Sequence, residues 1–168
     1  LKDFCAYVAD NTPKERNIIA ANEGNAVALA SGYHLATGKF GLVYMQNSGL
    51  GNAVNPLTSL ADKDVYSIPM LLFIGWRGEP GVKDEPQHVK MGKVTLSLLD
   101  ALKIPYVILN ENYEEIIKNA ATHLKNEKSP YAIVVKKDTF EKYELKSQQK
   151  TDFELDREEA IKTIIPLL

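Results

Sequence analysis

The feature that most constrains the fold is a regular alternation of short apolar runs with segments of helical periodicity. Apolar or β-favouring runs, which predict strands, occupy residues 17–21, 40–45, 69–75, 106–109 and 131–135. Helices are predicted at residues 1–9, 24–36, 53–65, 89–102, 113–125 and 156–165. Because parallel strands need helical crossovers, this rhythm predicts an α/β fold: a doubly wound, mainly parallel sheet with helices on both faces and a flavodoxin-like outline.

Length and composition exclude several classes of protein. A chain of 168 residues is long enough for one domain with a sizeable hydrophobic core. Its net charge of −2 gives no sign of the basic surface that nucleic-acid binding requires. No apolar run approaches the roughly 18 residues of a membrane span, so no membrane partner is expected. The single cysteine, Cys5, excludes a disulfide within the chain and predicts a reducing, cytoplasmic setting. The chain opens on Leu1 in helical pattern, which indicates a fragment of a longer protein.

Right-handed crossovers bring the carboxyl ends of parallel strands to one edge of the sheet, where ligands bind. That edge is expected to collect Glu23, residues 46–51 and residues 76–88. Glu23 lies between a predicted strand and a predicted helix whose first half has almost no side chains, so another chain or a flat ligand can lie close to its backbone. The alternative is a carboxylate that only starts a helix, where the helix dipole favours it.

Two other chemistries fit poorly. The run from Gly49 to Val54 begins like a dinucleotide-binding fingerprint, but Val54 replaces the third glycine, which close packing of helix on strand requires. His34, His88 and His123 fall in three separate predicted elements without paired spacing, so no metal site is expected.

Three loop motifs in order carry a more specific signal. They are Glu-Gly-Asn-Ala at 23–26, Tyr-Met-Gln-Asn-Ser-Gly-Leu-Gly-Asn at 44–52, and Gly-Trp-Arg-Gly-Glu-Pro-Gly at 75–81 with Glu-Pro-Gln-His at 85–88. Together they resemble the pyrimidine-binding domain of the thiamine diphosphate-dependent decarboxylases of phosphonopyruvate and sulfopyruvate. The resemblance implies a pyrimidine-binding domain at residues 1–137. Residues 138–168 would be a linker, or a domain-end extension toward a missing diphosphate-binding domain.

The resemblance also implies an activity: conversion of phosphonopyruvate to phosphonoacetaldehyde and CO2, with sulfopyruvate as the alternative substrate. Glu23 matches the glutamate that hydrogen-bonds N1′ of the cofactor's aminopyrimidine in this family. Burial is expected to raise its affinity for the proton that it shares. A doubly wound domain that binds a ligand or partner without chemistry remains the other class of function.

The remaining candidate site residues are assigned less directly. Residues proposed to line the pyrimidine pocket are Asn47, Ser48, Gly49 and Leu50; an ordinary turn is the alternative. His88 is a candidate catalytic proton donor or acceptor, or else an exposed histidine at a helix start. For the substrate, Gln87 is a candidate polar contact, and Arg77 with Lys83 would meet a phosphonate or sulfonate unless the loop is simply solvated.

One absence points to a partner. The family holds the cofactor's diphosphate and Mg²⁺ with an Asp-Gly…Asn motif, and no Asp-Gly dipeptide occurs in this chain. Mg²⁺ is therefore expected to bind to a diphosphate-binding domain or subunit outside it. The resemblance implies a homo-oligomer acting on a small anionic 2-keto acid, with the isolated chain inactive.

Overall fold

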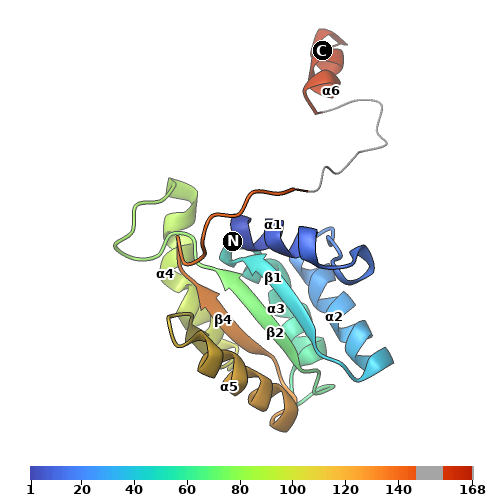
Figure 1. Cartoon of the computed structure of the whole chain (residues 1–168), viewed down its shortest axis with the longest axis vertical. Helices are drawn as coiled ribbons and strands as arrows, with labels where there is room; N and C mark the ends of the chain where they lie inside the picture. Colours follow the sequence, from blue (N-terminus) through green and yellow to red (C-terminus); the bar gives the residue numbers. More distant parts are fainter. Residues whose placement is uncertain (147–156, 168) are drawn as a thin grey trace.

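The computed structural model describes residues 1–146 and 157–167 (Figure 1). Within those residues the centre is a sheet of four strands: β1 (Gly41–Gln46), β2 (Met70–Gly75), β3 (Tyr106–Ile108) and β4 (Tyr131–Val135). The strand order is β1-β2-β4-β3, and each neighbouring pair is parallel. The predicted parallel sheet is confirmed.

Helices cover both faces of the sheet, as expected for a doubly wound fold (Figure 1). The α-helices are α1 (Lys2–Asn11), α2 (Glu23–Thr37), α3 (Leu50–Pro56), α4 (Pro86–Ala101), α5 (Tyr113–Asn126) and α6 (Arg157–Ile164). The short helical turns are η1 (Lys14–Arg16), η2 (Asn47–Gly49), η3 (Leu57–Ala61) and η4 (Ile165–Leu167). One core layer joins α2, α3 and α4 to the sheet, and a second joins α1 and α5 to its other face. Among the described residues, no helix is long and apolar enough to cross a bilayer.

Strand β2 shows why the central strands are apolar throughout. Leu72 and Ile74 belong to the layer with α2, α3 and α4, whereas Phe73 belongs to the layer with α1 and α5. All three are buried because successive side chains point to opposite, covered faces. The apolar runs that predicted β2 and β4 therefore identified strands covered on both sides.

The strand predicted at residues 17–21 is wrong. These residues lie outside any strand, and Ile18 and Ile19 are 64% and 86% exposed. A strand forms only with a hydrogen-bonded neighbour, and in the described part of the chain the outer edge of β1 remains unpaired. The composition of the segment suits a strand, but no neighbouring strand forms backbone hydrogen bonds with it in the described part of the chain.

The bounds of two helices differ clearly from the prediction. The helix expected at 53–65 begins at Leu50 and ends at Ala61, with a π-helical turn directly after Pro56. Helix α4 begins at Pro86, because proline lacks an N–H and suits the first turn of a helix. His88 and its neighbour Gln87 therefore lie in the first turn of α4, and not in the preceding loop.

The segment after β4 runs along α1. The Tyr143 backbone N–H donates to Asp3 Oδ1 at 3.0 Å, and the Phe140 ring lies 5.6 Å from that of Phe4. Residues 138–146 thus pack on the core unit, while the boundary at residue 137 stays a prediction. The helix expected at 156–165 is confirmed as α6, and Asp156, its predicted cap, lies outside the described residues.

The layer assignment can be tested by truncating one leucine on each kind of surface. Leu72→Ala is expected to lower the free energy of unfolding by about 2–5 kcal/mol, because Leu72 is fully buried between sheet and helices. The matched control is Leu42→Ala, since Leu42 is 52% exposed on β1 and should lose clearly less. Urea denaturation measures both variants, and equal losses would contradict the layers described.

Candidate functional site

The candidate site lies where the carboxyl ends of β1, β2 and β4 meet. Gln46 pairs with Gly75 and Gly75 pairs with Val135, so these three strands end side by side. The chain leaves β1 through the turn η2 into α3, and it leaves β2 through a loop at residues 76–85 into α4. The start of α2 packs against the same turn, which brings Glu23 to this edge as predicted.

Glu23 is the first residue of α2, and Asn22 caps that helix by accepting a hydrogen bond from the Asn25 N–H at 2.9 Å. The half-buried Glu23 side chain lies directly over Gly49. A Cβ at position 49 would lie 2.2 Å from Glu23 Cγ, and a Cβ at Gly24 would lie 2.8 Å from a backbone oxygen of α3. The two glycines therefore allow α2 and the turn after β1 to approach closely and cradle the carboxylate.

Asn52 is a site residue that the sequence reasoning missed. Its Nδ2 donates a hydrogen bond to Glu23 Oε2 at 2.8 Å. This hydrogen bond, helped by the Glu23 backbone amide, lowers the pKa of Glu23 despite the opposing effect of burial. The direction is opposite to the one expected from the sequence. Asn52 belongs to the second loop motif, so attention to every polar residue there would have found it.

The residues predicted to line the pyrimidine pocket have different surroundings. Gly49 contacts Glu23, Ser48 is exposed, and Leu50 is fully buried in the core. The fully buried Asn47 turns its amide inward: Nδ2 donates to the Arg77 carbonyl at 2.9 Å and to Thr95 Oγ1 at 2.8 Å. Their contacts with a cofactor stay a prediction.

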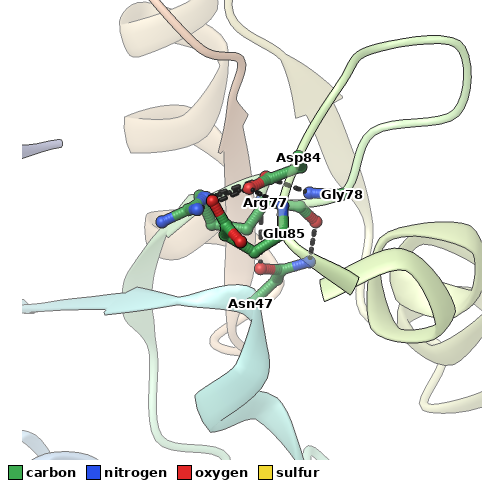
Figure 2. Close-up of polar contacts among 5 residues, drawn as sticks. All are labelled: Asn47, Arg77, Gly78, Asp84 and Glu85. Carbon is green, nitrogen blue, oxygen red and sulfur yellow. Dashed lines mark hydrogen bonds and ion pairs between the residues drawn. The ribbon is translucent and has the colours of Figure 1, made fainter. Parts of the chain in front are cut away.

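The loop after β2 is closed by an ion pair between Arg77 and Asp84 (Figure 2). Arg77 Nε donates to Asp84 Oδ2 at 2.8 Å, and the Gly78 N–H donates to the same oxygen at 2.7 Å. These bonds hold the pKa of Asp84 far below its usual range, and they raise the pKa of Arg77. The guanidinium predicted to meet a substrate anion therefore already has a carboxylate partner.

The other predicted substrate residues surround this loop. Lys83 and Gln87 are exposed, and His88 is half-buried in the first turn of α4. The three histidines remain in separate helices, α2, α4 and α5. Among the described residues, no group of three or more His, Cys, Asp or Glu side chains could hold a metal ion.

A cavity of about 400 Å³ opens at the same edge of the sheet. Its lining includes Gln46 and Arg77 together with the first residues of α1 and residues 135–140. Gln46 Nε2 is buried there without a hydrogen-bond partner among the described residues. A buried amide donor without a partner is costly, so Gln46 Nε2 is an unsatisfied polar atom beside this cavity.

A parallel α/β sheet with a cradled carboxylate at its ligand edge defines a ligand-binding domain, and comparison with known proteins identifies its family. Residues 1–102 match the family described as thiamine pyrophosphate enzyme, N-terminal TPP binding domain. The chain belongs to this family, which confirms the resemblance seen in the loop motifs.

Three relatives show the range of named activities. Phosphonopyruvate decarboxylase of Streptomyces viridochromogenes is 42% identical over 118 residues, which are 67% of this chain and 29% of the relative. The enzyme of the same name from Streptomyces hygroscopicus is 45% identical over 94 residues, 56% of this chain and 23% of the relative. Sulfopyruvate decarboxylase subunit alpha of Methanococcus maripaludis is 35% identical over 138 residues, 80% of this chain and 79% of the relative. The chain thus spans under a third of the first two relatives.

The contact between Asn52 and Glu23 predicts a change in proton affinity. Asn52→Ala should raise the pKa of Glu23, because it removes the main hydrogen bond that favours the ionised form. An NMR titration of the Glu23 carboxyl carbon measures the change. Asn55→Ala is the matched control, an exposed asparagine of the same helix that makes no side-chain contact with Glu23. A pKa unmoved by Asn52→Ala would contradict the assigned hydrogen bond.

Proposed function

We propose that this chain is the pyrimidine-binding part of a thiamine diphosphate-dependent 2-keto acid decarboxylase that converts phosphonopyruvate to phosphonoacetaldehyde and CO2. The observation that carries the proposal is the position of Glu23 in a member of this family. Its carboxylate lies at the ligand edge, at the start of α2, against a glycine turn that leaves room for nothing larger.

The surroundings of Glu23 fit an aminopyrimidine. One carboxylate oxygen accepts from Asn52, and no other residue of the described chain donates a side-chain hydrogen bond to this group. It would therefore be able to share a proton with N1′ of a bound aminopyrimidine. When bound, thiamine diphosphate supplies a nucleophilic carbon and an electron sink for the loss of CO2 from a 2-keto acid.

Glu23 and Asn52 have different roles at N1′ of the aminopyrimidine. Asn52 holds the carboxylate in one orientation, and Glu23 holds the proton shared with N1′. In this chain the Asn52 hydrogen bond outweighs burial and lowers the pKa of Glu23. Burial of Glu23 under a bound cofactor and a second protein surface would shift its pKa upward, toward the proton affinity that sharing needs.

The other half of the site is assigned to a partner. A diphosphate-binding domain or subunit would hold the diphosphate and Mg²⁺, since the described residues contain no acidic cluster for a metal. The isolated chain is then inactive, and a homo-oligomer or a complex of two subunits in the cytoplasm is the working enzyme.

The substrate's charged groups are assigned to the loop after β2 and the neighbouring cavity. Arg77 and Gln46 line that cavity, while Gln87 and His88 lie in the first turn of α4 beside the loop. Phosphonopyruvate is the preferred substrate because this chain is more similar in sequence to the two phosphonopyruvate decarboxylases than to the sulfopyruvate decarboxylase alpha subunit. Sulfopyruvate is the second candidate, favoured by the match that spans four fifths of both this chain and a sulfopyruvate decarboxylase alpha subunit.

The central role of Glu23 is tested in the complete enzyme, this chain with its diphosphate-binding partner. Glu23→Gln should lower kcat/KM for the 2-keto acid by about 10²-fold or more, because the amide cannot hold the shared proton. Glu15→Gln is the control, an exposed glutamate of η1 that makes no hydrogen bond to Glu23. Release of CO2 is measured at saturating cofactor and Mg²⁺, and full turnover by Glu23→Gln would refute the proposed mechanism.

Substrate choice is decided by assaying phosphonopyruvate and sulfopyruvate side by side with the same complete enzyme. We expect the higher kcat/KM for phosphonopyruvate, with phosphonoacetaldehyde as the product. A preference for sulfopyruvate would establish the second candidate, and turnover of neither compound would leave only the non-catalytic binding domain.

A further inference from the structure

The loop between β2 and α4 is fastened to itself by one carboxylate. Asp84 Oδ2 accepts from Arg77 Nε and from the Gly78 N–H, and Asp84 Oδ1 accepts from the Glu85 N–H at 2.8 Å. Residues near the start of the loop, Arg77 and Gly78, are thereby joined to Asp84 near its end (Figure 2). Arg77, Gly78, Asp84 and Glu85, connected in this way, are called the clasp below.

The clasp is stronger than an ordinary surface ion pair. Arg77 meets Asp84 through both Nε and Nη2, and the Asp84 side chain is only 11% exposed. Exposed single-contact pairs contribute little to stability, but a guanidinium fork that meets a carboxylate through two nitrogens fixes geometry as well as charge. The depressed pKa of Asp84 keeps the carboxylate ionised at every pH at which the protein would be assayed.

Asn47 binds the clasp through hydrogen bonds to the backbone of Arg77. Its Nδ2 donates to the Arg77 carbonyl, its Oδ1 accepts from the Arg77 N–H at 3.1 Å, and the same amide reaches Thr95 of α4. Both backbone groups of Arg77 are therefore fixed to the turn after β1. Asn47 thus joins the turn that carries Gly49 to the loop that carries the clasp.

Gly78 connects the clasp to α4 by direct backbone packing. Its φ of +67° is a left-handed conformation that favours glycine, and a Cβ there would lie 2.0 Å from the His88 carbonyl oxygen. A Cβ at Gly92 would in turn lie 1.7 Å from the Gly78 oxygen. The backbone of Gly78 thus packs directly on the first two turns of α4, where His88 lies.

We propose that Asp84 is a positioning residue that, through Arg77 and Gly78, holds the first turn of α4 and so sets the place of His88 at the ligand edge. Its effect on turnover rests on the proposed function, whereas its effect on the loop does not. The guanidinium edge formed by Nε and Nη2 belongs to the clasp, so substrate contact by Arg77 would use its remaining nitrogen, Nη1.

The structural part is tested by amide hydrogen exchange in the complete enzyme. Asp84→Asn should speed exchange of the Gly78 amide by about tenfold or more, because a neutral amide oxygen accepts more weakly than the carboxylate from both Gly78 and the Arg77 guanidinium. Asp100→Asn is the matched control, since Asp100 is exposed at the far end of α4 and its carboxylate makes no hydrogen bond or ion pair with the residues that the structure describes. Unchanged Gly78 exchange in Asp84→Asn would overturn the proposal.

Trp76, the single tryptophan, shows whether the change stays local. Its Nε1 donates to the Gly92 carbonyl at 2.8 Å, and its backbone N–H donates to Val135. Neither bond involves the clasp, so the emission maximum of Asp84→Asn should equal that of the wild type. A shift to the emission of an exposed indole would mean that the whole loop detaches, and would overturn a local role.

The catalytic part is tested with a double-mutant cycle on the same enzyme. If Asp84 acts through His88, the single substitution Asp84→Asn lowers kcat. The same substitution then has little further effect on kcat in a His88→Gln background. A general loss of stability would give additive effects, and additive effects would overturn the positioning role. Failure of the wild type to turn over either 2-keto acid would refute the proposed function, while the exchange result would still decide the clasp.

Discussion

The buried amide of Asn47 is the interaction on which the ligand edge depends. A fully buried polar side chain is tolerated only when its hydrogen bonds are made, and this amide satisfies both backbone groups of Arg77 and the hydroxyl of Thr95. An apolar residue of similar size would leave buried donors and acceptors unpaired, at a cost of about 1–3 kcal/mol for each group. One side chain thus joins the turn after β1, the loop after β2 and α4 into a single frame.

The sheet was predictable from the sequence because its main signal is local. The central strands β2 and β4 are covered on both faces, so nearly every position in them is apolar and the run itself marks a strand. The error at residues 17–21 has the same origin: the run suits a strand, but pairing depends on a neighbour that a local pattern does not contain. The start of α4 was missed because Pro86 and its charged neighbours were interpreted as loop, although proline favours the first helical turn.

The candidate site was predictable only in part, because its contacts join residues far apart in the chain. Glu23 was found from its place before a helix of small residues, and that place is confirmed. Its partner Asn52 lies 29 positions away, and no spacing rule connects the two residues. Likewise, nothing in the sequence shows that Asn47 turns toward the core, or that the guanidinium of Arg77 already has a carboxylate partner in Asp84. Residue types and loop motifs located the site, but hydrogen-bond partners had to come from the fold.

The state of Glu23 depends on what lies over the face beside it. Ile18 and Ile19 are exposed next to the start of α2, and Leu29 is half-exposed on α2 itself. With water there, the Asn52 hydrogen bond dominates and favours the ionised carboxylate. Under the proposed function a partner surface and a bound cofactor also cover Glu23 itself, and desolvation would then act on its carboxyl group in the opposite direction, favouring the protonated form. Under the proposed function the two effects oppose each other, so the pKa of Glu23, which is lowered in the uncovered chain, would rise toward the proton affinity that sharing needs once the site is closed.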